Sequence, residues 1–190
     1  LDQEQKERAL KESKGLPSLR LNFELVSDVE NIATGVYSPL EGFLGKKEYR
    51  NVLNQMRLSN DLPWPIPIVL DAGEEEAKKL KIGQKVILRG ESDQPIALLH
   101  LEEIYEYDKE EMAEKVFQTK DAAHPGVAKV KEMKDLLLAG KIDLIQESPT
   151  PFFKYKLSPR ETRVLFKEKG WRTVVGFQTR NTPHIGHEYV

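Results

Sequence analysis

The sequence predicts an α+β protein in which a mixed β-domain with helices is followed by the beginning of an α/β domain. Three observations support this prediction. Several short strand-like runs separated by turn residues occupy the chain as far as Tyr107, which is typical of a small mixed β-barrel or curled sheet. A stretch that contains both prolines and aromatic residues then follows at 148–159. Finally, the apolar run at 172–178 suits a strand that is buried on both faces, as in a parallel sheet.

The hydrophobic periodicity and the turn residues locate the elements of the first part. Alternation of apolar and polar residues predicts strands, including an edge strand interrupted by prolines, at 18–25, 63–71, 84–90, 95–107 and 141–146. Helical spacing and helix stop signals predict helices at 1–15, 28–34, 49–56, 73–83, 108–118 and 124–137. Residues 148–157 are expected to lie along a surface as a linker.

A new domain is expected to begin at Ser158. Ser158 is suited to be the N-cap of a helix, Pro159 to occupy its first turn and Glu161 to complete a capping box, and Gly170 is the stop signal. The predicted strand at 172–178 follows directly. The sequence therefore predicts two domains, residues 1–157 and residues 158–190.

Composition and charge exclude several classes of protein. The chain has 29 basic and 31 acidic residues in 190, which gives a net charge of −2 and no overall field for a polyanion such as nucleic acid. It has no Cys, so disulfides and thiolate metal sites are excluded within it. No apolar stretch is long enough to span a membrane, and the charged N-terminal residues are unlike a signal peptide. We predict a cytoplasmic protein that binds neither nucleic acid nor membranes.

The residues after the predicted last strand carry the chemistry. In open α/β sheets, ligands bind at the carboxyl ends of strands, where a following helix presents free N–H groups to an anion. Arg180 offers a planar fork for a tetrahedral oxyanion, and Gly186 allows close approach of a phosphate to the backbone. His184 and His187 are three residues apart and share one helical face, so both can reach one ligand. The pattern predicts stabilisation of charge on phosphate oxygens.

The same residue types also allow other roles. His184 and His187 with Glu188 form an alternative metal site, but no Cys and no third close His supports it, so we predict no metal ligands in this chain. His100 is predicted to be a hydrogen-bonded residue of the barrel, and His124 a capping or turn residue. The basic cluster at 129–134 is predicted to be a solvated helix face.

The stretch "GFQTRNTPHIGHEYV" resembles the first active-site motif of the ATP sulfurylase (sulfate adenylyltransferase) family. Upstream, "NIATGVYSPLEGFL", "WPIPIVLD", "ALLHLEEIYEYD" and "HPGVAKV" are similar to that family's PUA-like N-terminal domain and the segment after it. The resemblance implies a PUA-like domain followed by the first strand-loop-helix of a Rossmann-like nucleotidyltransferase domain. It also implies a reaction in which ATP and sulfate give adenosine 5′-phosphosulfate and pyrophosphate, with Mg²⁺ accompanying the nucleotide.

The resemblance assigns roles by motif position. The implied sulfate-binding residues are Gln178 and Arg180. The implied catalytic residues are Thr179, Arg180, Asn181, His184 and His187. The implied ATP-binding residues are Gln178, Thr179, Arg180, Asn181, His184, Gly186 and His187.

Two departures from the family pattern are visible. Thr182 comes between Asn181 and Pro183, and Ile185-Gly186 stands where Arg-Ala is commoner. The second change gives the general His-x-Gly-His of the wider nucleotidyltransferase superfamily, but any role of an arginine at position 185 is lost.

The sequence supplies only one strand of the sheet that such a domain needs. We therefore expect the chain to be the front part of a longer enzyme and to be inactive alone. Family likeness implies a homo-oligomer, most often a dimer. Two other functions stay open at this point: another His-x-Gly-His nucleotidyltransferase, or a PUA-like module that binds RNA or a protein.

Overall fold

A long antiparallel strand pair organises the first part of the molecule. β5 (Pro95–Glu106) and β6 (Leu136–Leu144) run side by side from the pair Ala97 and Leu144 to the pair Glu106 and Leu136, with a register shift between Leu101 and Glu103. The structure, a computed structural model, describes residues 3–12 and 15–189. These fall into two units, Leu1–Lys156 and Leu157–Val190.

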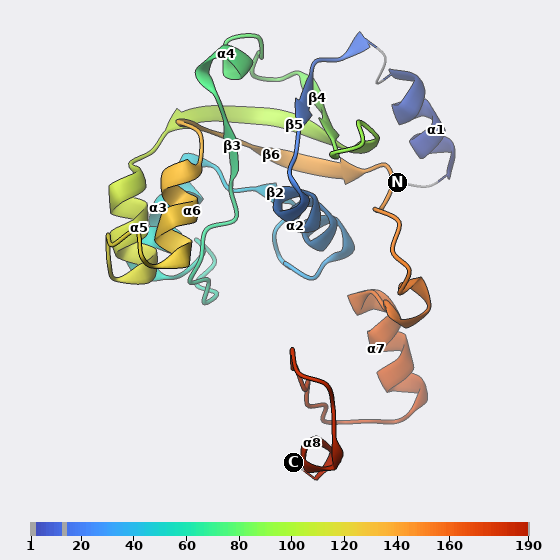
Figure 1. The fold of residues 1–190 in the computed structure, drawn as a ribbon. Coiled ribbons are helices and arrows are strands. Elements are labelled where there is room, and N and C mark those ends of the chain that lie inside the picture. Colours follow the sequence, from blue (N-terminus) through green and yellow to red (C-terminus); the bar gives the residue numbers. More distant parts are fainter. Residues whose placement is uncertain (1–2, 13–14, 190) are drawn as a thin grey trace. The chain divides into compact units, whose positions relative to one another are not determined.

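Four further strands complete a mixed sheet around this pair (Figure 1). They are β1 (Ser18–Arg20), β2 (Gly42–Phe43), β3 (Leu70–Ala72) and β4 (Lys85–Arg89). β1 is parallel to β4, whereas the other pairings are antiparallel. The order is β1-β4-β5-β6-β2, and β3 also pairs with β6. Since no pairing among the described residues links β2 back to β1, this is a curled open sheet, one of the two forms that the sequence predicts.

Helices cover the sheet in two groups. The apolar face of α2 (Phe23–Thr34) buries Val26, Val29 and Ile32 against sheet residues in the largest core cluster. A second cluster is built from α3 (Lys46–Gln55), α5 (Lys109–Phe117) and α6 (Pro125–Glu132), which lie together at one end of the β5–β6 pair (Figure 1). The first unit also contains α1 (Gln3–Glu12) and the short helix α4 (Glu74–Ala77).

Two glycines allow β6 to approach its two neighbouring strands, β5 and β2, closely. A Cβ on Gly140 would lie 1.9 Å from the carbonyl oxygen of His100, and a Cβ on Gly42 would lie 1.9 Å from the carbonyl oxygen of Gly140. Gly140 also has a φ of +152°, a conformation that side chains rarely adopt. Any other residue at these positions would push three strands apart.

The strand predicted at 18–25 is wrong in its second half. β1 ends at Arg20, and α2 begins at Phe23 rather than near residue 28. The reason is the N-cap: the Asn22 side-chain oxygen accepts a hydrogen bond of 2.9 Å from the backbone N–H of Leu25. Gly35 ends the helix with a φ of 85°, as its stop signal predicts.

Two other strand predictions have wrong bounds. The predicted edge strand at 63–71 pairs only over Leu70–Ala72, after its prolines. The last strand is longer than the predicted 141–146, because β5 offers partners to residues 136–144. The helix predicted at 124–137 therefore stops at Glu132.

The remaining helices and strands predicted for this unit are present as helices and strands. α5 and the β4–β5 hairpin fall within the predicted ranges. α3 begins at Lys46, before the predicted 49–56, and α4 covers the first turn of the helix predicted at 73–83. The helix predicted at 1–15 is present as α1, although residues 1–2 and 13–14 lie outside the described residues. No described helix is long and apolar enough to cross a bilayer.

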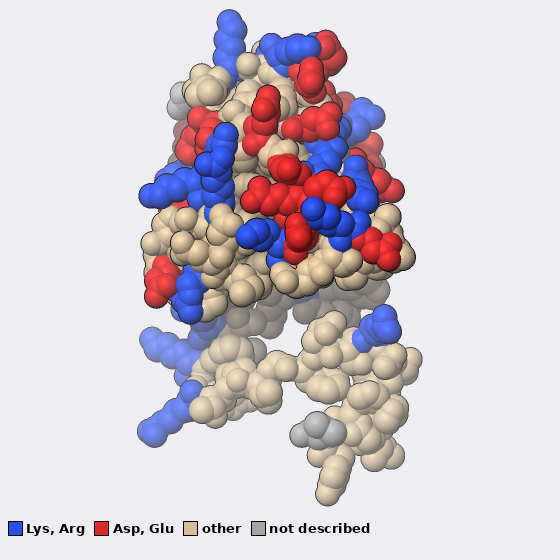
Figure 2. Space-filling view, turned by 90° about the vertical axis from the view of Figure 1, so that its left-hand side faces the viewer, with Lys and Arg blue, Asp and Glu red and all other residues tan. Residues whose placement is uncertain are grey.

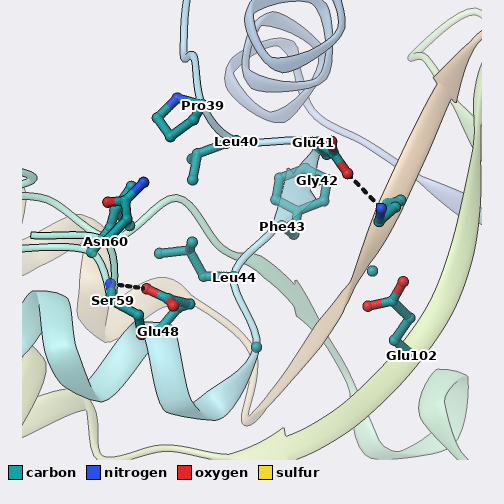
Figure 3. Close-up of a pocket in the computed structure, with 14 residues that line it drawn as sticks. Pro39, Leu40, Glu41, Gly42, Phe43, Leu44, Glu48, Ser59, Asn60 and Glu102 are labelled. Carbon is teal, nitrogen blue, oxygen red and sulfur yellow. Dashed lines mark hydrogen bonds and ion pairs between the residues drawn. The ribbon is translucent and has the colours of Figure 1, made fainter. Parts of the chain in front are cut away.

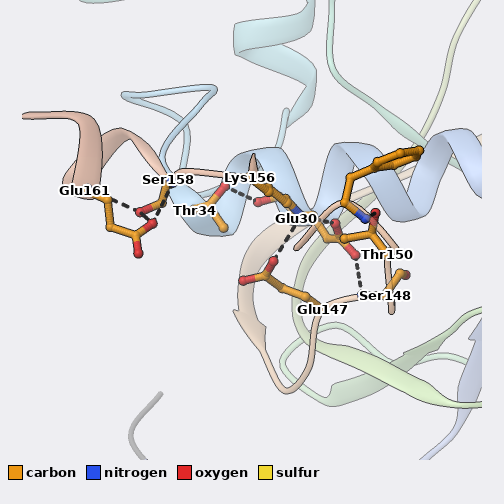
Figure 4. A network of polar contacts seen from close by, with 9 residues as sticks. Glu30, Thr34, Glu147, Ser148, Thr150, Lys156, Ser158 and Glu161 are labelled. Atoms are coloured by element: carbon orange, nitrogen blue, oxygen red, sulfur yellow. Dashed lines mark hydrogen bonds and ion pairs between the residues drawn. The ribbon is translucent and has the colours of Figure 1, made fainter. Parts of the chain in front are cut away.

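The segment that follows β6 is fastened to α2 by Glu30 (Figure 4). One carboxylate oxygen of Glu30 accepts a hydrogen bond of 2.6 Å from the backbone N–H of Ser148, and the other accepts one of 3.1 Å from Lys156. Lys156 also pairs with Glu147 at 3.0 Å. The predicted linker thus lies along a surface and is held there at both ends.

The described residues of the second unit, 157–189, form two helices, α7 (Pro159–Glu168) and α8 (Ile185–Glu188). α7 has the predicted N-terminus: the hydroxyl of Ser158 accepts from the backbone N–H of Glu161, whose carboxylate accepts 2.7 Å hydrogen bonds from the backbone N–H and the hydroxyl of Ser158. These bonds, the backbone one foremost, lower the pKa of Glu161. Gly170 follows the helix with a φ of +66°.

Candidate active site

The predicted strand at 172–178 does not form in this structure. Residues 173–179 have no regular secondary structure, and the exposed fractions of Val174, Val175 and Phe177 are 52%, 92% and 60%. A parallel strand needs hydrogen-bonded neighbours, and the described part of the second unit contains no other strand. The strand prediction is therefore wrong for this structure, and its apolar side chains are left without a core.

The helix predicted near His184 is confirmed, with His184 as its N-cap. The Nδ1 atom of His184 accepts a hydrogen bond of 3.1 Å from the backbone N–H of Gly186. The backbone N–H of His184 in turn donates to the Nδ1 atom of His187 at 3.2 Å. These reciprocal bonds form a capping box that uses two imidazoles in place of the usual hydroxyl and carboxylate.

The two imidazole rings are brought together as the spacing predicts. Their centroids are 3.9 Å apart and their planes are tilted by 57°. Because both Nδ1 atoms accept backbone hydrogen bonds, the neutral form of each ring carries its proton on Nε2. The site therefore presents two Nε2–H donors, a pair suited to the oxygen atoms of a phosphate.

The polar loop before α8 is ordered by a short turn. The backbone N–H of Asn181 donates to the hydroxyl oxygen of Thr179 at 3.0 Å, a local bond of the kind that Thr often makes in turns. Gln178, Arg180 and Asn181 are exposed, while Thr179 and His187 are partly buried. No hydrogen bond or ion pair joins the side chains of Gln178 or Arg180 to another described residue, so both are available to a ligand.

The site residues thus fall into two groups. The structure joins Thr179 to Asn181, and it joins His184, Gly186 and His187. Direct bonds between the two groups are not present among the described residues, and the predicted convergence of Arg180 with the two imidazoles stays a prediction. No group of three or more described His, Asp or Glu side chains is placed to hold a metal ion.

Sequence reasoning missed one residue of this site, Phe177. Its ring contacts the ring of His187 edge to face, with centroids 5.8 Å apart and planes at 67°. The strand interpretation placed Phe177 in a buried sheet, so its position next to His187 was not foreseen. The available signal was its place immediately before the polar loop.

The two other histidines have the predicted structural roles. His100 Nε2 lies 2.7 Å from a carboxylate oxygen of Asp143 across the β5–β6 pair. His124 is the N-cap of α6 and accepts a hydrogen bond of 3.1 Å from the backbone N–H of Gly126. Neither lies in the second unit.

The basic cluster on α6 and after it is neutralised by ion pairs. Lys129 pairs with Glu24, Lys131 with Glu110 at 3.9 Å and Lys134 with Glu76 at 2.6 Å, and the side-chain bond from Lys134 lowers the pKa of Glu76. On the face that carries α3, α5 and α6, acidic and basic side chains are interspersed (Figure 2). This face therefore presents no field of a single sign.

The first unit has a separate open cavity of about 380 Å³ beside β2 (Figure 3). Glu41 pairs with Lys141 at 2.5 Å on one side of it, and Glu48 accepts a hydrogen bond of 2.9 Å from the backbone N–H of Ser59 on the other. The polar groups in these two contacts are thus already occupied. None of the predicted site residues at 178–187 lines this cavity.

Two family models match the chain. The model described as "PUA-like domain" matches residues 1–147, and the model described as "ATP-sulfurylase" matches residues 153–190. The chain therefore belongs to the PUA-like domain family, and its last part is similar to ATP-sulfurylase. The ATP-sulfurylase match contains every predicted site residue, whereas the PUA-like match contains the whole curled sheet.

Individual relatives agree with these matches. The sulfate adenylyltransferase of Hyperthermus butylicus is 55% identical over 185 residues, which are 97% of this chain and 47% of that protein. The sulfate adenylyltransferase of Thermococcus onnurineus is 56% identical over 97% of this chain and 48% of that protein. The chain spans about half the length of the curated relatives it matches.

A solved structure has the same fold over nearly the whole chain. It is described as a hexameric APS kinase from Thiobacillus denitrificans, with a TM-score of 0.75 and 26% sequence identity. The match covers 99% of this chain and 34% of that chain.

Proposed function

We propose that the chain acts, within a polypeptide of its relatives' length, as a sulfate adenylyltransferase. In this reaction ATP and sulfate give adenosine 5′-phosphosulfate and pyrophosphate. The observation that carries the proposal is the paired imidazoles of the ATP-sulfurylase segment, whose Nδ1 atoms are both occupied and whose Nε2–H groups are both free to donate. The identity of 55% to a sulfate adenylyltransferase over 185 residues supports the choice of substrate.

The chemistry that this site would perform is a direct displacement. A sulfate oxygen attacks the α-phosphorus of ATP in line, a new oxygen–phosphorus bond forms, and the bond to the pyrophosphate oxygen breaks. Such a reaction needs no covalent enzyme intermediate and depends on positioning and on stabilisation of charge. His184 and His187 would donate from Nε2 to the phosphate oxygens as negative charge grows there.

The loop residues would hold the two substrates. Arg180 and Gln178 would bind sulfate, since a guanidinium fork and an amide N–H₂ both donate to a tetrahedral oxyanion. Thr179 and Asn181 would line the nucleotide phosphates together with these two. Gly186 would let a phosphate approach the first turn of α8, because no side chain stands there.

Mg²⁺ would enter with the nucleotide rather than be held by this chain. Hard divalent cations prefer carboxylate and phosphate oxygens. The described residues provide no acidic cluster at the site. The ion's role would be to neutralise the phosphate oxygens of ATP.

We further propose that the two parts of the chain have different roles. Residues 1–157 would serve as the PUA-like domain and its linker, and residues 158–190 as the beginning of a Rossmann-like nucleotidyltransferase domain. The apolar side chains at 174–177, which are exposed here, suit a strand that completes its burial in such a domain. A homo-oligomer, with a dimer as the first expectation, is part of the proposal.

A comparison of cosubstrates tests the proposal. A polypeptide of the relatives' length is incubated with ATP and Mg²⁺, and pyrophosphate release is measured with sulfate, with a phosphorylated alcohol and with neither. We expect release that depends on sulfate. Release that depends on the phosphorylated alcohol instead would favour another His-x-Gly-His nucleotidyltransferase and would contradict the proposed substrate.

A further inference from the structure

Three aromatic rings follow one another in the candidate active site. Phe177 contacts His187 at a centroid distance of 5.8 Å, and His187 contacts His184 at 3.9 Å. The two histidines are each anchored at Nδ1 by a backbone N–H. Phe177 comes from the segment before the polar loop, so it joins that segment to α8 by a side-chain contact.

The hydrogen bond to His187 leaves its ring incompletely fixed. One bond at Nδ1 restrains a single atom, and the χ2 torsion of histidine has a broad energy well. A ring flip would exchange the carbon and nitrogen positions and would break the bond from His184 N–H. An edge-to-face contact with a second aromatic ring restrains the plane of the imidazole, which the hydrogen bond alone does not do.

We propose that Phe177 is a positioning residue that holds the His187 ring with Nδ1 toward the backbone and Nε2–H free for the phosphate oxygens. This inference rests on the proposed function for its catalytic consequence. The ring contact itself does not rest on it. Phe177 acts through His187 and need not touch the substrate.

The position of Phe177 in the chain favours this role over simple core packing. In this structure 60% of its side chain is exposed, and its aromatic partner is the catalytic histidine rather than an apolar cluster. Val175, two residues earlier, is 92% exposed and makes no ring contact among the described residues. Val175 is therefore a matched control for any general effect of the segment.

Two substitutions distinguish an effect of the aromatic ring of Phe177 from an effect of its apolar volume. Phe177→Leu keeps an apolar side chain but removes the aromatic edge, whereas Phe177→Tyr keeps the ring. Ring nitrogen chemical shifts of His187, measured by NMR on the 190-residue chain, report which nitrogen carries the proton. We expect the Nε2–H tautomer in the native chain, in Phe177→Tyr and in Val175→Ala, and a mixture of tautomers in Phe177→Leu.

The kinetic arm uses a polypeptide of the relatives' length with ATP, Mg²⁺ and sulfate. A misplaced catalytic group costs between about 10- and 100-fold in kcat, so Phe177→Leu should lose that factor with little change in the KM for ATP. Phe177→Tyr should restore most of the rate.

The NMR and kinetic experiments can contradict the positioning role and the proposed function separately. An unchanged His187 tautomer in Phe177→Leu, or a kcat equal to that of the native enzyme, would overturn the positioning role. A native enzyme that ignores sulfate would overturn the proposed function. A tautomer change in that same protein would still support the restraint of His187 by Phe177.

Discussion

Replacing Glu30 by Ala should release the segment after β6 from α2. Glu30 is the only acidic residue of the described chain that binds both Ser148 and Lys156, and just 13% of its side chain is exposed. Ala is the best helix former, so the substitution does not weaken α2 through its backbone. The segment after β6 then loses both of its hydrogen bonds to Glu30 of α2.

The cost follows from the two contacts. A hydrogen bond to a charged group contributes about 1.5–3 kcal/mol, which applies to the 2.6 Å bond from Ser148 N–H because Glu30 is largely buried. The pair with Lys156 adds less than about 1 kcal/mol, because the Lys156 side chain is 43% exposed. Together these values predict a local loss of about 2 kcal/mol. This corresponds to roughly 30-fold more frequent opening, at about 1.4 kcal/mol for each factor of ten.

Hydrogen exchange of the Ser148 amide measures this opening directly. We expect roughly 30-fold faster exchange in Glu30→Ala, with exchange in the β5–β6 pair unchanged. Glu147→Ala is the matched control, because Glu147 also pairs with Lys156 but its side chain is 43% exposed and it holds no amide of the segment. Equal exchange rates at Ser148 in both variants would refute the role assigned to Glu30.

Three further substitutions test the first unit by thermal unfolding. Tyr105→Phe should cost about 1–2 kcal/mol, because the buried Tyr105 hydroxyl donates a 2.7 Å hydrogen bond to the carbonyl oxygen of Leu44, which would lose its partner; an unchanged Tm would contradict this. Gly140→Ala should cost more than about 4 kcal/mol because its Cβ would meet backbone at 1.9 Å, whereas the control Gly15→Ala, with nothing within 4 Å, should be tolerated. Burial raises the pKa of Asp28 above its ordinary 3.8, so the protonated carboxyl favours folding below that pH and this stabilisation is lost as the pH rises through the higher folded value. Asp28→Asn should therefore raise the Tm at pH 7, and the gain should shrink toward pH 4; a constant gain would show that the charge is not responsible.

Most of the fold could be predicted from local signals. The stop glycines, the capping box at Ser158 and the alternation in β4 and β5 each reflect short-range physics, and each is found where the sequence indicates it. Predictions were wrong where tertiary partners decide the outcome, or where a local helix cap competes with an alternating pattern. β6 is longer than its pattern because β5 offers it nine paired positions, and Asn22 starts a helix inside what reads as an alternating strand.

The candidate site shows the same division. The helix at His184 and the pairing of two imidazoles three residues apart follow from helical geometry, and both are found. The strand before them could not form from its own residues, because parallel strands depend on neighbours distant in the chain. For the same reason the contact of Phe177 with His187 was not predicted.

The central claim is tested most directly by comparing Arg180→Ala with Arg172→Ala in a polypeptide of the relatives' length. The measurement is the sulfate-dependent release of pyrophosphate from MgATP. Arg180 is assigned to the oxyanion, whereas Arg172 is an equally exposed arginine outside the polar loop. We predict that Arg180→Ala lowers kcat/KM for sulfate by at least about 100-fold, since a lost charged hydrogen bond costs about 1.5–3 kcal/mol and Arg180 can donate two. Arg172→Ala should retain the native rate. Equal rates in the two variants, or release that does not require sulfate, would contradict the account.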